Sequence, residues 1–146
     1  MPIARGILFA AALLTLGAHT ADAQAKEAAM KIRFTLNGTV VTATLEDNAT
    51  ARDFIAMLPL TVTLEDFAAT EKIAYLPAKL NTQGAPSGID PSAGDVTYYA
   101  PWGNLALFHK DFRHSPGLVK LGRIDQGIEA LRITGSAVVT IEQEGD

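Results

Sequence analysis

The feature that most constrains this chain is an Asn37-Gly38 dipeptide within a stretch of alternating polar and apolar residues at 30–45. An Asn-Gly pair is the strongest short signal for a type I′ turn, because both central residues of that turn need a positive φ. A two-residue turn also sets the register. Phe34 then faces Val41, and the large apolar side chains of both strands fall on one face. The sequence therefore predicts a β-hairpin that buries one face.

Further short stretches along the chain have the alternation or apolar composition that is typical of β-strands. They cover residues 60–64, 72–76, 95–99, 105–109, 118–121 and 137–141. Leu105 to Phe108 are apolar at every position, which indicates a strand buried on both faces, as when a barrel wall is covered by a helix. Residues 81–94 and 110–117 have no apolar period and contain Gly, Pro and Ser, so both are predicted to be loops.

Two short helices are predicted between these strands. Phe54 lies in a run of apolar residues at helical spacing, and Thr50 with Asp53 at its start resembles a capping box. The second helix is expected to begin with a cap at Asp125 and to carry Leu131 on its buried side. Both segments are too short to cover a sheet on both faces.

The number and length of these elements favour a mainly β fold. The 146 residues, of which 48% are hydrophobic, suit one domain with a sizeable core. Strands that do not alternate regularly with long helices argue against a doubly wound parallel sheet. About eight strands can close into a barrel that is filled by its own side chains, and closure removes exposed edges. We predict a closed eight-stranded β-barrel with two short helices, and two packed sheets are the competing architecture.

The first residues have the pattern of a secretory signal peptide. Arg5 is followed by an unbroken run of apolar, small and hydroxyl residues at 6–16, and overlapping Ala-x-Ala sites follow at 21–25. The run is shorter than the roughly 20 residues that a membrane span needs. We therefore predict a signal peptide over residues 1–23 and a domain over residues 24–146, without a membrane span in the mature chain. The expected location is outside the cytoplasm, periplasmic or secreted.

Composition and motifs exclude several classes of function. The formal net charge of −4 disfavours nucleic-acid binding, and the absence of cysteine excludes thiolate chemistry and disulfides. Neither a G-x-S-x-G motif nor a phosphate-binding loop occurs. His109 and His114, with Asp111 and Asp125 nearby, match no recognised metal-ligand spacing. We predict neither a metal nor a cofactor.

A cluster of aromatic residues is the main candidate for a binding site. Tyr99, Trp102 and Phe112 lie close together in the sequence, with Arg113 and His114 directly after them. Aromatic side chains with a few polar groups near a barrel mouth suit a groove for a peptide or a small organic molecule. Trp102 lies in a predicted turn and is equally well explained as part of the core.

Arg123 is a further candidate ligand-binding residue, because a guanidinium group near a pocket can hold a carboxylate or a peptide carbonyl. The alternative interpretation is an internal ion pair with Asp95 or Asp125 that holds a loop in place. The two interpretations differ in outcome, because a ligand-binding role predicts lost affinity on substitution and an ion pair predicts lost stability.

Several segments together resemble a known family. They are Glu71-Lys72 with Tyr75-Leu76-Pro77, Gly94-Asp95 with Tyr98-Tyr99, Asn104-Leu105-Ala106-Leu107-Phe108, and Leu121-Gly122-Arg123-Ile124-Asp125. In these segments the chain is similar to the small bacterial cyclophilin-like family, from about residue 30 to residue 142. The resemblance implies a closed eight-stranded barrel capped by short helices. It implies no settled activity, and the family is distinct from the peptidyl-prolyl isomerase cyclophilins.

The catalytic residues of isomerase cyclophilins are only partly matched. Phe108-His109-Lys110 resembles their F-H-R segment with Lys in the place of Arg, and Gln126-Gly127 resembles an incomplete Q-G-G. An ammonium group does not replace a planar guanidinium that donates in a fixed plane. We therefore expect an exported cyclophilin-like domain that binds a peptide or small organic ligand. An isomerase with a degenerate site and a non-catalytic partner-binding accessory protein are the alternatives.

Overall fold

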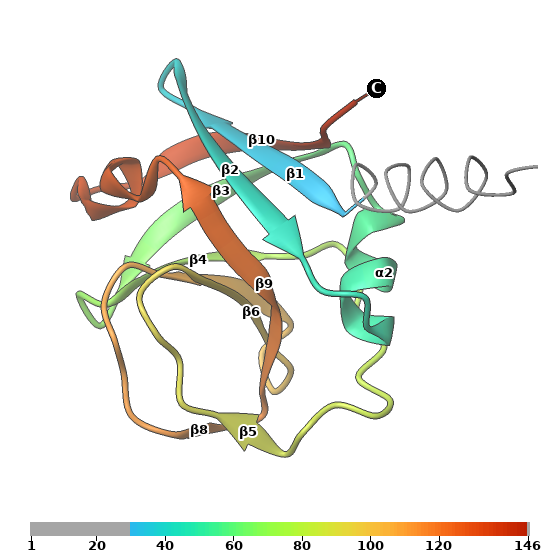
Figure 1. Ribbon diagram of the computed structural model, residues 1–146. Coiled ribbons are helices and arrows are strands. Elements are labelled where there is room, and N and C mark those ends of the chain that lie inside the picture. Colours follow the sequence, from blue (N-terminus) through green and yellow to red (C-terminus); the bar gives the residue numbers. More distant parts are fainter. Residues whose placement is uncertain (1–29, 146) are drawn as a thin grey trace, which may run out of the picture.

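The computed structural model of the protein describes residues 30–145 (Figure 1). The predicted signal peptide over residues 1–23 and the predicted start of the domain at residue 24 lie outside the described residues. Within the described part of the chain, no helix has the length and apolar character needed to cross a membrane.

The described chain forms a closed antiparallel barrel of eight strands, as predicted, rather than two packed sheets (Figure 1). Each strand is hydrogen-bonded to an antiparallel neighbour on both sides. In their order around the barrel the strands are β1 (Lys31–Leu36), β10 (Ala137–Gln143), β3 (Leu60–Phe67), β4 (Glu71–Tyr75), β7 (Asn104–Phe108), β6 (Asp95–Tyr99), β9 (Leu118–Gln126) and β2 (Thr39–Leu45).

The predicted hairpin is formed by β1 and β2. Asn37 and Gly38 adopt φ angles of 49° and 75°, which are the positive values that a type I′ turn requires. The register pairs Phe34 with Val41, and both side chains are fully buried in the barrel. The turn and the alternating pattern therefore agree on the same register.

The two helices differ in part from the prediction. In α2 (Ala49–Ile55) the cap is Asn48, whose side chain accepts a hydrogen bond from the Ala51 amide at 2.8 Å. Thr50 is not the cap, because its hydroxyl donates to the carbonyl of Asn81 at 2.7 Å. The second helix, η1 (Ile128–Arg132), is a 3-10 helix that begins after Gly127 at a φ of 91° and has no side-chain cap.

Asp125 does not cap this helix, because β9 is longer than predicted and runs to Gln126. The Asp125 carboxylate instead accepts a hydrogen bond from the Thr44 hydroxyl at 2.7 Å. The helices α2 and η1 follow the ends of the antiparallel neighbours β2 and β9, so they lie at opposite ends of the barrel (Figure 1). Phe54 of α2 and Leu131 of η1 both pack into the core, which closes the barrel at both ends.

Strand β7 is buried on both faces, as predicted, but neither of the two helices in residues 30–145 covers its outer face. Leu105 and Leu107 point into the barrel core, whereas Ala106 and Phe108 belong to a second apolar cluster on the outside of the wall. The two predicted loops provide the cover. They contain the short strands β5 (Gly88–Ile89) and β8 (Ser115–Pro116), which pair with each other in a small two-stranded sheet outside the barrel (Figure 1).

The end of the barrel that carries η1 is held by a buried lysine. The Lys72 side chain is 3% exposed, and its ammonium group donates to the carbonyls of Ile133 and Gly135, each at 2.7 Å. The same ammonium group forms an ion pair with Asp66, whose carboxylate also accepts from the Gly135 amide. These contacts connect the start of β4 with the segment between η1 and β10.

Replacing Lys72 with methionine should destabilise the fold. The variant leaves two carbonyls without their donor and removes one partner of an ion pair, so we expect the free energy of unfolding to fall by about 2–4 kcal/mol. Urea denaturation measures this change. The exposed Lys79, replaced in the same way, is the control and should change stability by less than about 0.5 kcal/mol. Equal effects of the two substitutions would contradict the role assigned to Lys72.

Candidate functional site

The outer face of the barrel wall carries the residues of the candidate site. Side chains alternate between the faces of a strand, so Glu71 of β4 shares the outer face with Phe108, its partner on β7. At the other end of the same face, Asn104 is paired with Tyr99 of β6, and Tyr99 is paired with Leu118 of β9. Four adjacent strands therefore supply one continuous floor.

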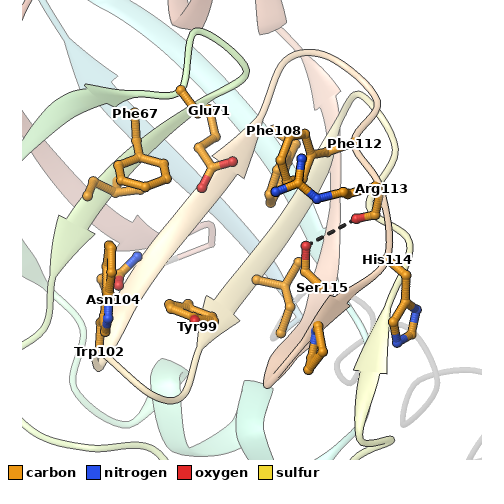
Figure 2. Close-up of a pocket in the computed structure, with 14 residues that line it drawn as sticks. Phe67, Glu71, Tyr99, Trp102, Asn104, Phe108, Phe112, Arg113, His114 and Ser115 are labelled. Atoms are coloured by element: carbon orange, nitrogen blue, oxygen red, sulfur yellow. Dashed lines mark hydrogen bonds between the residues drawn. The ribbon is translucent and has the colours of Figure 1, made fainter.

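A cavity of about 500 Å³ lies on this floor (Figure 2). Its walls come from the turn between β3 and β4, the turn between β6 and β7, and the segment that leads into β8. We call this cavity the wall groove, and its lining residues are Phe67, Ala68, Glu71, Ile73, Tyr99, Trp102, Asn104, Phe108, Phe112, Arg113, His114, Ser115, Pro116 and Leu118.

The structure brings together all the predicted site residues except Arg123. Tyr99, Trp102, Phe112, Arg113 and His114 all line the wall groove. The groove lies on the outer wall and not at the barrel mouth, where these residues were expected. The physical reason is that the barrel interior is filled by its own apolar side chains and closed by α2 and η1, so space for a ligand remains only outside.

Trp102 stands at one end of the groove between two other aromatic rings. Its ring lies edge-to-face with Phe67, at 5.5 Å between centroids, and with Tyr99, at 5.3 Å. Trp102 is 51% exposed and Phe67 is 39% exposed, so both rings keep a large apolar surface in contact with solvent. Of the two interpretations of Trp102, the exposed one fits the structure.

The opposite side of the groove is formed by the segment between β7 and β8. The rings of Phe108 and Phe112 are stacked at 6.4 Å, and the guanidinium group of Arg113 lies 4.6 Å from the Phe112 centroid. The Ser115 hydroxyl donates to the Arg113 carbonyl at 3.1 Å (Figure 2). Phe108 is buried, as expected for a core residue, and lines the groove as well.

His114 closes the groove on the side of β5. Its Nδ1 atom lies 2.6 Å from Oδ1 of Asp90, and both side chains are exposed. Gly88 permits this approach, because a Cβ atom at that position would lie 2.7 Å from the Ser115 carbonyl oxygen and 2.9 Å from Nε2 of His114. A glycine is thus required where β5 meets β8.

Glu71 is a site residue that sequence reasoning missed. The residue is 8% exposed, and its carboxyl group accepts a hydrogen bond from the Thr70 hydroxyl at 3.1 Å. Burial raises the pKa of this carboxyl, and the Thr70 hydrogen bond offsets part of the increase. In the view of Figure 2 the carboxyl group points into the groove between Phe67 and Phe108. The pairing of β4 with β7, which places Glu71 there, joins segments that are distant in the sequence.

Asn104 is the second residue that was missed. It is 1% exposed, and its amide nitrogen donates to the Leu105 carbonyl at 2.9 Å. Its side-chain oxygen is buried and has no hydrogen-bond partner in the described residues. An acceptor left without a donor in a buried position costs free energy, so such groups are uncommon away from functional sites. The sequence offered one sign of Asn104 as a site residue, because it is a polar residue directly before the apolar run Leu105 to Phe108.

Arg123 lies outside the groove. Its guanidinium group donates to the Asp95 carboxylate at 2.8 Å and to the Ala93 carbonyl at 3.0 Å. Asp95 is buried and is the cross-strand partner of Arg123 between β6 and β9. The internal ion pair, with Asp95 as the partner rather than Asp125, therefore describes this residue.

Of the residues considered for metal binding and for isomerase chemistry, only His114 and Phe108 are among the lining residues of the groove. His109 is buried, its Nδ1 atom has no partner in the described residues, and burial lowers its pKa. No group of three or more His, Asp or Glu side chains between residues 30 and 145 is arranged to hold a metal ion. Lys110 and Gln126 are both exposed, and neither lines the groove.

The closed antiparallel barrel with short helices at its two ends is a cyclophilin-like domain. The chain belongs to the Cyclophilin-like family, whose profile matches residues 34–142. The resemblance inferred from the sequence is thus confirmed.

A solved structure supports the same fold. The solution structure of a hypothetical protein from Archaeoglobus fulgidus superimposes with a TM-score of 0.59, at 20% identity, over 78% of this chain and 94% of that chain. A likeness at this identity shows the fold and not the function. No curated protein matches the chain.

The raised pKa of Glu71 predicts a pH dependence of stability. A pKa above the ordinary value of 4.5 means that the folded chain binds the proton more tightly than the unfolded chain. The stability contributed by protonated Glu71 is therefore present at acid pH and is lost as the pH rises through the raised pKa. The variant Glu71→Gln has no carboxyl group to ionise at this position, so this stability should not be lost as the pH rises. Its free energy of unfolding relative to that of the native chain should therefore increase toward neutral pH. Urea denaturation between about pH 4 and about pH 7 measures the difference, and a difference independent of pH would contradict the assignment.

Proposed function

We propose that this protein is an exported cyclophilin-like domain that binds a peptide or a small organic ligand in the wall groove. The observation that carries the proposal is a cavity of about 500 Å³ with a mainly aromatic and aliphatic lining, which also includes the polar residues Glu71 and Asn104. Ligand sites typically combine an apolar concave surface with a few polar groups that orient the ligand.

Energetics support the same conclusion. Covering apolar surface is worth roughly 25 cal/mol per Å², so the exposed rings of Trp102 and Phe67 offer a favourable contact to any apolar group. The backbone that holds the groove is fixed by hydrogen bonds from the Phe112 amide to the Pro91 carbonyl at 3.0 Å and from the Gly117 amide to the Ser87 carbonyl at 2.8 Å. A largely pre-formed site loses less conformational entropy when a ligand binds.

Isomerisation of X–Pro bonds is the second candidate function. The observation that favours it is the guanidinium group of Arg113, which stands beside Phe108 and Phe112 in the same groove. In isomerase cyclophilins a planar guanidinium group donates hydrogen bonds beside an apolar pocket. Lys110, which stands in the place of that arginine in the sequence, has an ammonium group instead, whereas Arg113 has a guanidinium group. A non-catalytic accessory that holds a partner protein would use the same exposed rings.

Ligand binding should change the fluorescence of Trp102, which is the chain's single tryptophan. The test is a titration with a panel of short proline-containing peptides and small apolar organic molecules. Because Phe112 forms one side of the groove, Phe112→Ala should weaken binding of any hit by at least about tenfold. Val138→Ala, which truncates an exposed residue of β10 that does not line the groove, should leave the affinity unchanged.

The same titration separates the candidate functions. If a proline peptide binds and its slow cis–trans interconversion is not accelerated, the function is ligand binding without catalysis. Acceleration that is lost in Arg113→Ala would establish the isomerase instead. No response to any member of the panel, together with a co-purified protein contacting Trp102, would favour the accessory role.

Export is tested by the mass of the mature protein. When residues 1–146 are expressed in a bacterium with two membranes, the product recovered outside the cytoplasm should begin at Gln24. Placing a charge in the apolar run with Leu13→Arg should retain the chain inside with Met1 still present. Recovery of an uncleaved native chain from the cytoplasm would contradict the proposal.

A further inference from the structure

The wall groove holds an acidic group without a cationic partner. Apart from the hydroxyl of Thr70, the Glu71 carboxyl makes no hydrogen bond to a described residue, and it forms no ion pair with one. The adjacent Lys72 points to the other face of β4, where its ammonium group is held by Asp66 and two carbonyls. A carboxylate in an apolar surrounding is stabilised chiefly by an approaching cation or hydrogen-bond donor.

The charged side chains across the groove do not neutralise Glu71. Arg113 lies over the Phe112 ring, and His114 is directed to Asp90 on the side of β5. Neither interaction involves the Glu71 carboxyl, whose raised pKa reflects burial and not a neighbouring charge. A ligand that supplies a positive charge would therefore meet a carboxyl group that no cation of the described residues neutralises.

The neutral part of the groove points to the same ligand chemistry. The buried side-chain oxygen of Asn104, which is part of the groove lining, is an acceptor without a donor among the described residues. The rings of Phe67, Trp102 and Tyr99 present π-electron surfaces, which attract a cation within about 6 Å of a ring centroid. An acidic group without a cationic partner and several aromatic rings form a surface that favours a cation over an anion.

We infer that the ligand of the wall groove is an organic ammonium ion with an apolar body, an inference that rests on the proposed function. The ammonium group donates to the Glu71 carboxylate, and the rings of Phe67 and Trp102 cover the apolar body. Carboxylate and phosphate ligands are disfavoured, because they would place a second negative charge beside Glu71.

The test compares two probes of similar shape, 2-phenylethylamine and the neutral 2-phenylethanol, by Trp102 fluorescence at neutral pH. The amine is protonated there, because alkylamines have pKa values of about 10. The native protein should bind the amine at least about tenfold more tightly, as expected for a hydrogen bond between charged groups. In Glu71→Gln this preference should disappear while binding of the alcohol persists.

Glu129→Gln is the matched control. It removes the same charge from an exposed position in η1, outside the groove, and should keep the preference for the amine. Circular dichroism and thermal melting establish that each variant is folded. Loss of the preference in Glu129→Gln would mean that net charge alone attracts the amine, and it would overturn the inference.

The remaining outcomes separate this inference from the function on which it rests. Equal affinity of the native protein for both probes would overturn the ammonium inference and leave ligand binding intact. The same holds if neutral members of the panel bind and the amine does not. If no probe and no member of the panel binds at millimolar concentration, the proposed function fails together with the inference.

Discussion

Closure of the barrel is the constraint on which the rest of the structure depends. Each strand has neighbours on both sides, so the inner face of every strand must be filled with side chains from the chain itself. Phe54 and Leu131 complete this core from the two ends. With the interior filled, the polar and aromatic groups that remain can gather only on the outside. The wall groove is accordingly formed by the outer face of the wall and by the segments that cross it.

The segments between the strands build a second, smaller apolar cluster on that wall. Phe112 and Ile89 are carried over the outer faces of β4, β7 and β9, where they pack against Phe108 and Leu118. Backbone hydrogen bonds, such as that from the Gly94 amide to the Phe108 carbonyl at 2.8 Å, hold these segments to the barrel. The cover is incomplete, and the wall groove is the part of the outer face that it leaves open.

The polar groups of the site gain their character from this position. A glutamate on an exposed strand is solvated and has an ordinary pKa, whereas Glu71 is buried on the wall and its pKa is raised. Arg123 shows the opposite case. Its charge is already matched by Asp95, so it contributes to the connection between β6 and β9 and not to the groove.

Local patterns in the sequence located the eight barrel strands and the hairpin at Asn37-Gly38, because a period of two and a turn that needs positive φ depend only on neighbouring residues. The same patterns did not show that β9 extends to Gln126 or that β5 and β8 pair within the predicted loops. They also predicted the proximity of Tyr99, Trp102 and Phe112, which lie close together along the chain. Only the tertiary structure decided that these residues lie on the wall, and that Glu71 and Asn104 join them. The alternation along a strand shows which residues share a face, but where both faces are apolar it does not show which face points inward. The pairing of distant strands supplies that answer, because closing the barrel assigns one face of β4 and β7 to the core and leaves the other to the groove.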